Sequence, residues 1–377
     1  MKKLLAILLA LLLMLSVALP AFAFPSSEEG DGRDETFGIA KGYVRTKEHR
    51  KEGEDAYLCV RTYNKQGKLT KETQTTKGSD YSYTTTSKYV YDKKGNLTKE
   101  TLYESDYTIV TTRTYNSKGK VTKEVSKTTY EDNSTYVSTC TYTYNKAGKL
   151  TKELAYYEDC EDLTTYTYNK AGDVTKQVQT QKYEDNSQDK TTQTWTYDKN
   201  RNETKWTMVD KDRYGGSEKR TRVSTYNQKN LCTQMTETWS YTNNKGSTDK
   251  SKDVTTYTYD KKGRVTKETF KQTFGDGSVR TLVFANAYDE KGNLIQKVIT
   301  EKTDDYSIKS TTTYTYNNKR LVKEVTVNKD EDGTFKTTET YTYDKAGNLT
   351  KYVCSYRYAD GSGSKETTTY AYQKIAA

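Results

Sequence analysis

The sequence predicts an all-β fold, in which antiparallel, up-and-down β-hairpin repeats form an extended, twisted or spiralling sheet of about 22 strands. Three observations predict it. A Tyr followed by Asp or Asn recurs about every 28 residues. The runs between turns alternate with period two, which is typical of half-buried strands. The chain also holds 36 Tyr, abundant Thr and no proline after Pro25, a composition that favours uninterrupted strand pairing.

The N-terminal segment has the features of a secretory signal peptide at 1–23. Lys2 and Lys3 precede an apolar stretch, and Ala21-Phe22-Ala23 forms a small-x-small cleavage site. The acidic, Gly- and Ser-rich residues 24–42 are expected to form a flexible lead-in. The mature chain is therefore expected to be secreted, extracellular or cell-wall associated, without a membrane span after cleavage.

The repeat array is predicted to cover 43–377, with an atypical hairpin at 43–63 that could cap it. The region 198–256 diverges, because its first turns lack glycine, and the three Trp lie in or beside it. Eleven clear units and a degenerate copy at Tyr372 are visible. Their marker tyrosines are Tyr63, Tyr91, Tyr115, Tyr144, Tyr168, Tyr197, Tyr226, Tyr259, Tyr288, Tyr316 and Tyr343.

Each unit is predicted to contain two strands and two turns. The first turn has the form [DN]-x-x-G, as at 92–95, which suits a type I turn closed by a left-handed glycine. The second turn is acidic and contains Gly or Asn, as at 131–134.

The first turn sets the predicted register. If Asp92 opposes Asn96, then Tyr91 opposes Leu97 and Tyr89 opposes Lys99. Alternation then gives a Tyr/Leu/Val/Lys face and a Thr/Glu face, with Lys stems over Tyr rings helping to hold the sheet. The rule places on the Tyr face Tyr142, Tyr144, Leu150, Leu154, Tyr115, Val121 and Val125, and on the other face Thr141, Thr143, Thr151 and Glu153.

The motif Y-[DN]-x-x-G-[NKRD]-[LV]-T-K resembles the YD repeats of bacterial Rhs-like and wall-associated secreted proteins. The best matches begin at Tyr91, Tyr259 and Tyr343, and the resemblance covers about 60–372. It implies long spiralling sheets, which in some members form hollow shells around a toxin. The period here is longer than the family's, and only five residues follow Tyr372 (373–377), which argues against toxin delivery. The hairpins also resemble the single-layer sheet of a spirochaete outer-surface lipoprotein.

No catalytic constellation is recognisable, so we expect no enzyme and no cofactor. His49 is the single histidine, and it lies in a charged run that suits a solvated turn. The acidic turn at 330–333 could suggest calcium, but it lacks the ligand spacing of a calcium loop, and turn chemistry explains it better. No metal site is expected.

The five cysteines are expected to be unpaired. Cys59 and Cys140 are predicted to share the Tyr face but to lie six strands apart, about 29 Å in a flat sheet. Cys160 is expected about 20 Å from Cys140. A Cys59–Cys140 bond would instead indicate tight curling.

The turn charges are predicted to separate by edge. The first turns are basic and the second turns acidic, most strongly at 158–162. Such edges could orient the molecule on an anionic wall polymer or promote side-by-side assembly, or they could serve solubility alone.

The Tyr face is the predicted binding surface, since extended aromatic patches mark interaction sites. The partners expected are a surface glycan, a wall polymer or another surface protein, and not nucleic acid. The alternatives are a structural spacer that self-associates through its terminal strands, a shell component of a toxin-delivery system, and a Tyr face that only stabilises the sheet or lines a curled interior. The candidate ligand-binding residues are Tyr89, Tyr91, Tyr142, Tyr144, Tyr166, Tyr168, Trp195, Tyr257 and Tyr259.

Overall fold

The computed structural model describes Ile39 and residues 43–303, 305–330 and 333–375. The strands in these residues form one antiparallel sheet of 24 strands. The predicted signal peptide and nearly all of the predicted lead-in lie outside these residues, as do two residues of the acidic turn at 330–333. The strands are β1 (Tyr43–Glu52), β2 (Asp55–Tyr63), β3 (Leu69–Lys77), β4 (Ser82–Tyr91), β5 (Leu97–Tyr103), β6 (Tyr107–Tyr115), β7 (Val121–Tyr130), β8 (Thr135–Tyr144), β9 (Leu150–Tyr156), β10 (Cys160–Tyr168), β11 (Val174–Tyr183), β12 (Gln188–Tyr197), β13 (Glu203–Lys211), β14 (Ser217–Tyr226), β15 (Cys232–Thr242), β16 (Thr248–Tyr259), β17 (Val265–Thr273), β18 (Val279–Tyr288), β19 (Leu294–Lys302), β20 (Ser307–Asn317), β21 (Arg320–Asp330), β22 (Gly333–Tyr343), β23 (Leu349–Arg357) and β24 (Gly363–Lys374).

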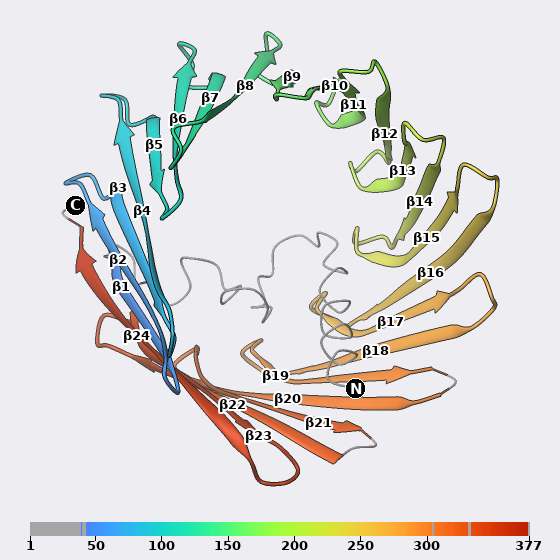
Figure 1. The fold of residues 1–377 in the computed structure, drawn as a ribbon. Helices are drawn as coiled ribbons and strands as arrows, with labels where there is room; N and C mark the ends of the chain where they lie inside the picture. The colour runs from blue at the N-terminus through green and yellow to red at the C-terminus, as the bar shows by residue number, and fades with distance from the viewer. Residues whose placement is uncertain (1–38, 40–42, 304, 331–332, 376–377) are drawn as a thin grey trace.

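The up-and-down array is confirmed, but the prediction of an open or spiralling sheet is wrong. β1 pairs with β2 on one side and with β24 on the other, so the strands form a complete ring (Figure 1). The sheet has 24 strands rather than about 22, because the hairpin at 43–63 and the degenerate copy at Tyr372 both contribute strands. Twist and coiling bring the first and last strands together, and pairing them satisfies both edges.

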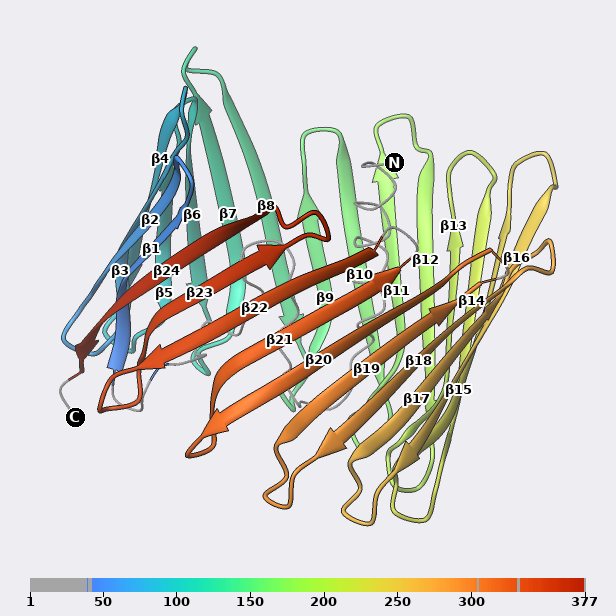
Figure 2. The same cartoon turned by 90° about the horizontal axis from the view of Figure 1, so that it is seen from below.

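The barrel is wide. Its strands are inclined to the barrel axis (Figure 2). At about 4.8 Å between strands and a typical tilt of about 40°, 24 strands give a circumference of about 150 Å and a backbone diameter of roughly 48 Å.

The first turns have the predicted geometry. The Asp92 N–H donates to the carbonyl oxygen of Asn96 (2.9 Å), and Gly95 takes φ of 84°. In the divergent region Arg201 (φ 69°) and Asn230 (φ 60°) occupy the position of the glycine, so the turn persists without it. The Asp or Asn that opens each turn bonds the backbone beyond it, as when Asp92 Oδ1 accepts from the N–H of Asn96.

A β-bulge follows each first turn, and it overturns part of the predicted register. Tyr91 opposes Leu97 as predicted, but Val90 opposes Lys99 and Tyr89 opposes Glu100. The extra residue is Thr98, and a single extra residue reverses the faces of everything beyond it. The same shift precedes Tyr63, Tyr91, Tyr115, Tyr144, Tyr168, Tyr197, Tyr226, Tyr259, Tyr288, Tyr316 and Tyr343, and on β1 it lies between Arg45 and Lys47.

One face of the sheet therefore carries Tyr and Glu, and the other carries Thr and Lys. The predicted placements of Leu154, Val125 and Glu153 are wrong, because Leu154 opposes Thr141, Val125 opposes Thr112 and Glu153 opposes Tyr142. The Tyr/Glu face is the less exposed: Val90 is 53% exposed, while Tyr89 and Tyr91 beside it are half-buried. Side chains converge on the concave side of a closed cylinder, so the Tyr/Glu face is the inner face. The buried apolar residues of the described chain all lie on it: Cys59, Ala155, Phe270, Leu282, Leu294, Tyr341, Leu349, Tyr352, Cys354 and Tyr370.

The marker tyrosines join each repeat to the one before it. Tyr91 Oη donates to the backbone carbonyl of Leu69, the first residue of the neighbouring β3 (2.8 Å), and Lys68 Nζ lies 5.2 Å from the centre of the same ring. Lysine therefore does cover tyrosine, but from the turn rather than from the T-K-E run. Corresponding hydroxyl–carbonyl bonds are made by Tyr63, Tyr115, Tyr144, Tyr168, Tyr197, Tyr226, Tyr259, Tyr288, Tyr343 and Tyr372.

Candidate aromatic and acidic belt of the inner wall

A belt of twelve cross-strand pairs runs around the inner wall. On each even-numbered strand, the residue two before the marker tyrosine points inward. The following strand carries the Thr-Lys pair of the repeat motif, and we call its lysine the T-K lysine (Lys99, for example). Because of the bulge, the residue after this lysine points inward and faces the residue of the even-numbered strand. We call these pairs the belt: Arg61–Glu72, Tyr89–Glu100, Arg113–Glu124, Tyr142–Glu153, Tyr166–Gln177, Trp195–Trp206, Ser224–Met235, Tyr257–Glu268, Asn286–Lys297, Tyr314–Glu324, Tyr341–Tyr352 and Tyr370–Glu48.

Two arginines link neighbouring belt pairs. Arg113 Nε lies 2.6 Å from Glu124 Oε2, and its Nη1 lies 3.3 Å from Glu100 Oε2 on the other side. Arg61 likewise lies 2.5 Å from Glu72 and 3.9 Å from Glu48. The belt is therefore held in part by charge-assisted bonds that run across strands.

Burial shifts the pKa of several belt side chains. It raises the pKa of the hydroxyls of Tyr142, Tyr257 and Tyr314, which are hydrogen-bond donors in their neutral form. Burial also raises the pKa of Glu268, while the charge of Lys297 acts in the opposite direction. Burial lowers the pKa of Lys297, whose Nζ lies 5.5 Å from the centre of the Phe284 ring.

The structure divides the nine predicted ligand residues into two groups. Five lie in the belt: Tyr89, Tyr142, Tyr166, Trp195 and Tyr257. Four are marker tyrosines whose hydroxyls already donate to backbone carbonyls: Tyr91, Tyr144, Tyr168 and Tyr259. All nine lie on the inner face and are half-buried. Only the five belt residues have a hydroxyl or ring edge that takes no part in the hydroxyl–carbonyl bonds that join successive repeats.

Sequence reasoning missed the glutamates of the belt. It placed them with threonine on the face opposite the tyrosines, because the predicted alternation contained no bulge. A signal was present, since the predicted register sets Arg61 opposite Lys71 and Arg113 opposite Lys123, whereas a bulge gives each arginine a glutamate. Trp206 was also missed; it opposes Trp195, and its Nε1 donates to Gln193 Oε1 (3.0 Å).

A pair of opposed carboxylates lies on the inner face outside the belt. Asp253 opposes Glu237 across β15 and β16, and one Asp253 carboxylate oxygen is buried without a hydrogen-bond partner in the described structure. Burial, together with the charge of Glu237, raises the pKa of Asp253 to about 6.

The cysteines and rims can also be placed. All five cysteines are free and lie on the inner face, Cys59 and Cys140 among them. Closure turns the two predicted edges into two rims, one formed by the basic first turns and one by the acidic second turns. In the part of the chain that the structure describes, no three His, Cys, Asp or Glu side chains meet as metal ligands would. The same residues contain no helix long and apolar enough to cross a membrane.

Comparisons with known proteins assign no family to the chain. No protein-family model matches the chain, and no curated protein matches it. Among solved structures, the chain is similar to a porin-like protein from Bacteroides uniformis, with 16% identity and a TM-score of 0.27 over 67% of this chain and 95% of that one. So low an identity and score transfer no role to this chain, and its function has to be argued from its own inner and outer faces.

Proposed function

We propose that the protein is a secreted or cell-surface, non-catalytic barrel that binds a surface glycan along the belt. The observation that carries the proposal is the repetition of an aromatic ring beside a carboxylate or amide on neighbouring strands of one wall. Aromatic faces cover the C–H face of a sugar, and carboxylates accept hydrogen bonds from its hydroxyls.

The barrel's width suits a chain-like ligand rather than an enclosed small molecule. With a backbone diameter of roughly 48 Å, opposite walls are too distant to contact one sugar. A polymer lying along the belt meets one pair about every 12 Å, since twelve pairs share a circumference of about 150 Å. Weak contacts repeated in this way add up through effective concentration.

The test compares inner and outer tyrosines. Tyr89→Ala and Tyr257→Ala remove belt rings, and Tyr103→Ala removes a ring from the outer face, where Tyr103 is 40% exposed and opposes Thr86. On a glycan array and in a pull-down with intact cell walls, the belt variants are expected to lose retention at least fivefold, and Tyr103→Ala less than twofold. Absence of retention by the wild-type protein, or equal loss in all three variants, would refute the proposal.

A protein ligand is the second candidate, because the inner face also carries a large excess of carboxylates. A small basic protein held in the barrel would fit the shell reading of the repeats. Protection of a lysine-rich probe protein from protease by the barrel, abolished by Glu100→Gln with Glu268→Gln, would favour this reading over glycan binding.

The lysines on the outer face argue against a lipid-facing barrel, because each would cost about 2–4 kcal/mol at the bilayer midplane. The spacer reading no longer has its predicted route to self-association, because β1 and β24 pair with each other rather than presenting free edges.

A further inference from the structure

The outer face carries a ring of lysines. The T-K lysine, which the bulge turns outward, occurs on ten of the twelve odd-numbered strands, and glutamine replaces it at Gln234 and Gln296. All ten are exposed, most stand opposite threonines, and neighbours on successive odd strands are about 12 Å apart around the barrel. They are Lys47, Lys71, Lys99, Lys123, Lys152, Lys176, Lys205, Lys267, Lys323 and Lys351.

The charge of this face is nearly of one sign. Within the described strands, Glu161 is the one carboxylate that the register places outward, and it stands opposite Lys182. The chain's net charge of +10 therefore conceals a strongly basic exterior and an acidic interior. Surfaces that serve solubility alone usually mix both signs.

Some cations of this face also stand where they weaken the sheet. Like charges directly opposite each other on a sheet are destabilising. Local rules broken in this way are expected at functional surfaces, where a ligand relieves the conflict. The described strands contain four such pairs on the outer face: Lys71–Lys88, Lys190–Lys211, Lys309–Lys329 and Lys336–Arg357.

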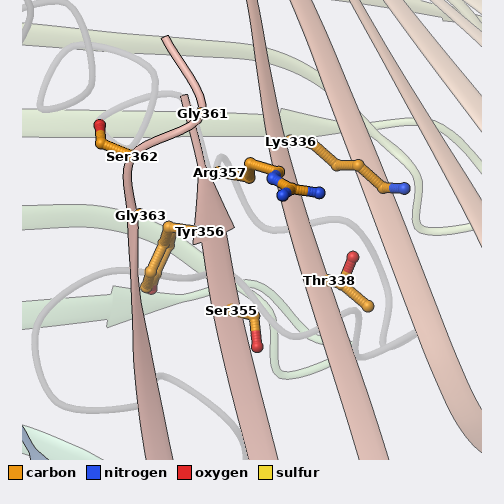
Figure 3. A pocket seen from close by; sticks show the side chains of 8 residues that line it. All are labelled: Lys336, Thr338, Ser355, Tyr356, Arg357, Gly361, Ser362 and Gly363. Atoms are coloured by element: carbon orange, nitrogen blue, oxygen red, sulfur yellow. The ribbon is translucent and has the colours of Figure 1, made fainter. Parts of the chain in front are cut away.

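One of these pairs lines a hollow. Lys336 opposes Arg357, and Thr338 opposes Ser355 one step along the same two strands. Figure 3 shows these four side chains grouped on β22 and β23 beside the turn at Gly361. The hollow measures about 440 Å³. Two cations and two hydroxyls around one depression match the oxygens of a phosphate group.

We propose that the outer face binds a flexible, phosphodiester-linked polyol polymer, with Lys336, Arg357, Thr338 and Ser355 forming a phosphate subsite. A flat membrane would contact only a narrow stripe of a cylinder roughly 48 Å across, whereas a flexible chain can follow the ring. A single-stranded nucleic acid would favour aromatic platforms for its bases, whereas between the lysines this face presents mainly Thr, Val and Ala. A duplex is too stiff to follow the ring and, like a membrane, would contact only a stripe of it.

The test uses the mature full chain and poly(glycerol phosphate) of defined length, with affinity measured by calorimetry at two salt concentrations. Binding that weakens steeply with salt is expected. Lys336→Gln/Arg357→Gln should lower the affinity about tenfold, while Lys176→Gln/Lys205→Gln, which removes the same charge from the ring, should lower it less than threefold. Far-UV circular dichroism checks folding, which neither variant should weaken.

Three outcomes would overturn the inference. Absence of binding at low salt removes the polymer. Tighter binding to phosphatidylglycerol vesicles or single-stranded DNA than to the polymer assigns the face to a membrane or a nucleic acid. Equal losses in the two double variants remove the phosphate subsite. The belt variants Tyr89→Ala and Tyr257→Ala should bind the polymer normally, so this test and the glycan test fail separately.

Discussion

The same short run of sequence supplies side chains to the inner and the outer face of the barrel, yet the two faces differ in charge and chemistry. In Leu97-Thr98-Lys99-Glu100, leucine and glutamate point inward, and threonine and lysine outward. Simple alternation would have grouped lysine with leucine and tyrosine. The bulge at threonine places lysine in the exterior ring and glutamate in the belt. One extra backbone residue per repeat thus produces two surfaces suited to different partners.

Removing β24 should have the largest effect, because the inside of the barrel is separated from the outside only while the ring is closed. A chain ending at Ser362 loses the ladders to β23 and β1 and exposes both as edges. We expect concentration-dependent association in small-angle scattering and a lower melting temperature. A monomer that melts like the full-length chain would show that closure contributes little.

Exchanging the two charged residues of one repeat should weaken the sheet next most strongly. Lys99→Glu/Glu100→Lys keeps the composition but places a lysine beside the Arg113 guanidinium, whose Nη1 now lies 3.3 Å from Glu100 Oε2. We expect a loss of about 1–2 kcal/mol in the free energy of unfolding, measured in urea. Lys99→Glu alone, which changes only the exterior, should stay within about 0.5 kcal/mol. Equal effects would contradict the assignment of faces.

Two neighbouring tyrosines separate structural from ligand-binding roles. Tyr259→Phe leaves the Cys232 carbonyl without its hydroxyl donor at 2.5 Å, and should lower the free energy of unfolding by about 1 kcal/mol. Tyr257→Phe, in the belt, should lower it by less than about 0.5 kcal/mol while reducing glycan retention. The reverse order in urea titrations would mean that the belt tyrosine is the structural one.

A pH dependence of stability is expected from the inner face. The Asp253 pKa is raised from 3.8 to about 6, so the folded chain binds a proton that the unfolded chain has released between these values. The contribution of Asp253 to stability is therefore complete below pH 4 and is lost as the pH rises through 6. Asp253→Asn should remove this fall, measured as melting temperature from pH 4 to 8. An unchanged pH profile would place the titration elsewhere.

Much of the architecture follows from sequence. The turn pattern around Asp92 and Gly95 fixes the hairpins, and the alternation around Tyr89 and Tyr91 fixes their strands, because both depend on local backbone preferences. The predicted aromatic face is also real, and five of its nine proposed ligands lie in the belt.

The bulge and the closure of the ring could not be predicted from these local preferences. A bulge adds one residue without altering composition, so only the charges of Arg61 and Arg113 could have revealed it. Closure depends on twist accumulated over 24 strands until Tyr43 meets Lys374, and a small change in twist per strand would leave the sheet open. No single repeat encodes that sum.

The pairing of β1 with β24 has a consequence for how the chain could be rewired. Because Tyr43 and Lys374 are register neighbours, a short linker could join them, and new termini could be opened in any first turn, such as the one at 92–95. Circular permutants cut at different repeats should then fold to the same barrel. The order of the repeats along the polypeptide would be a matter of synthesis, and their cyclic order around the ring would be what specifies the molecule.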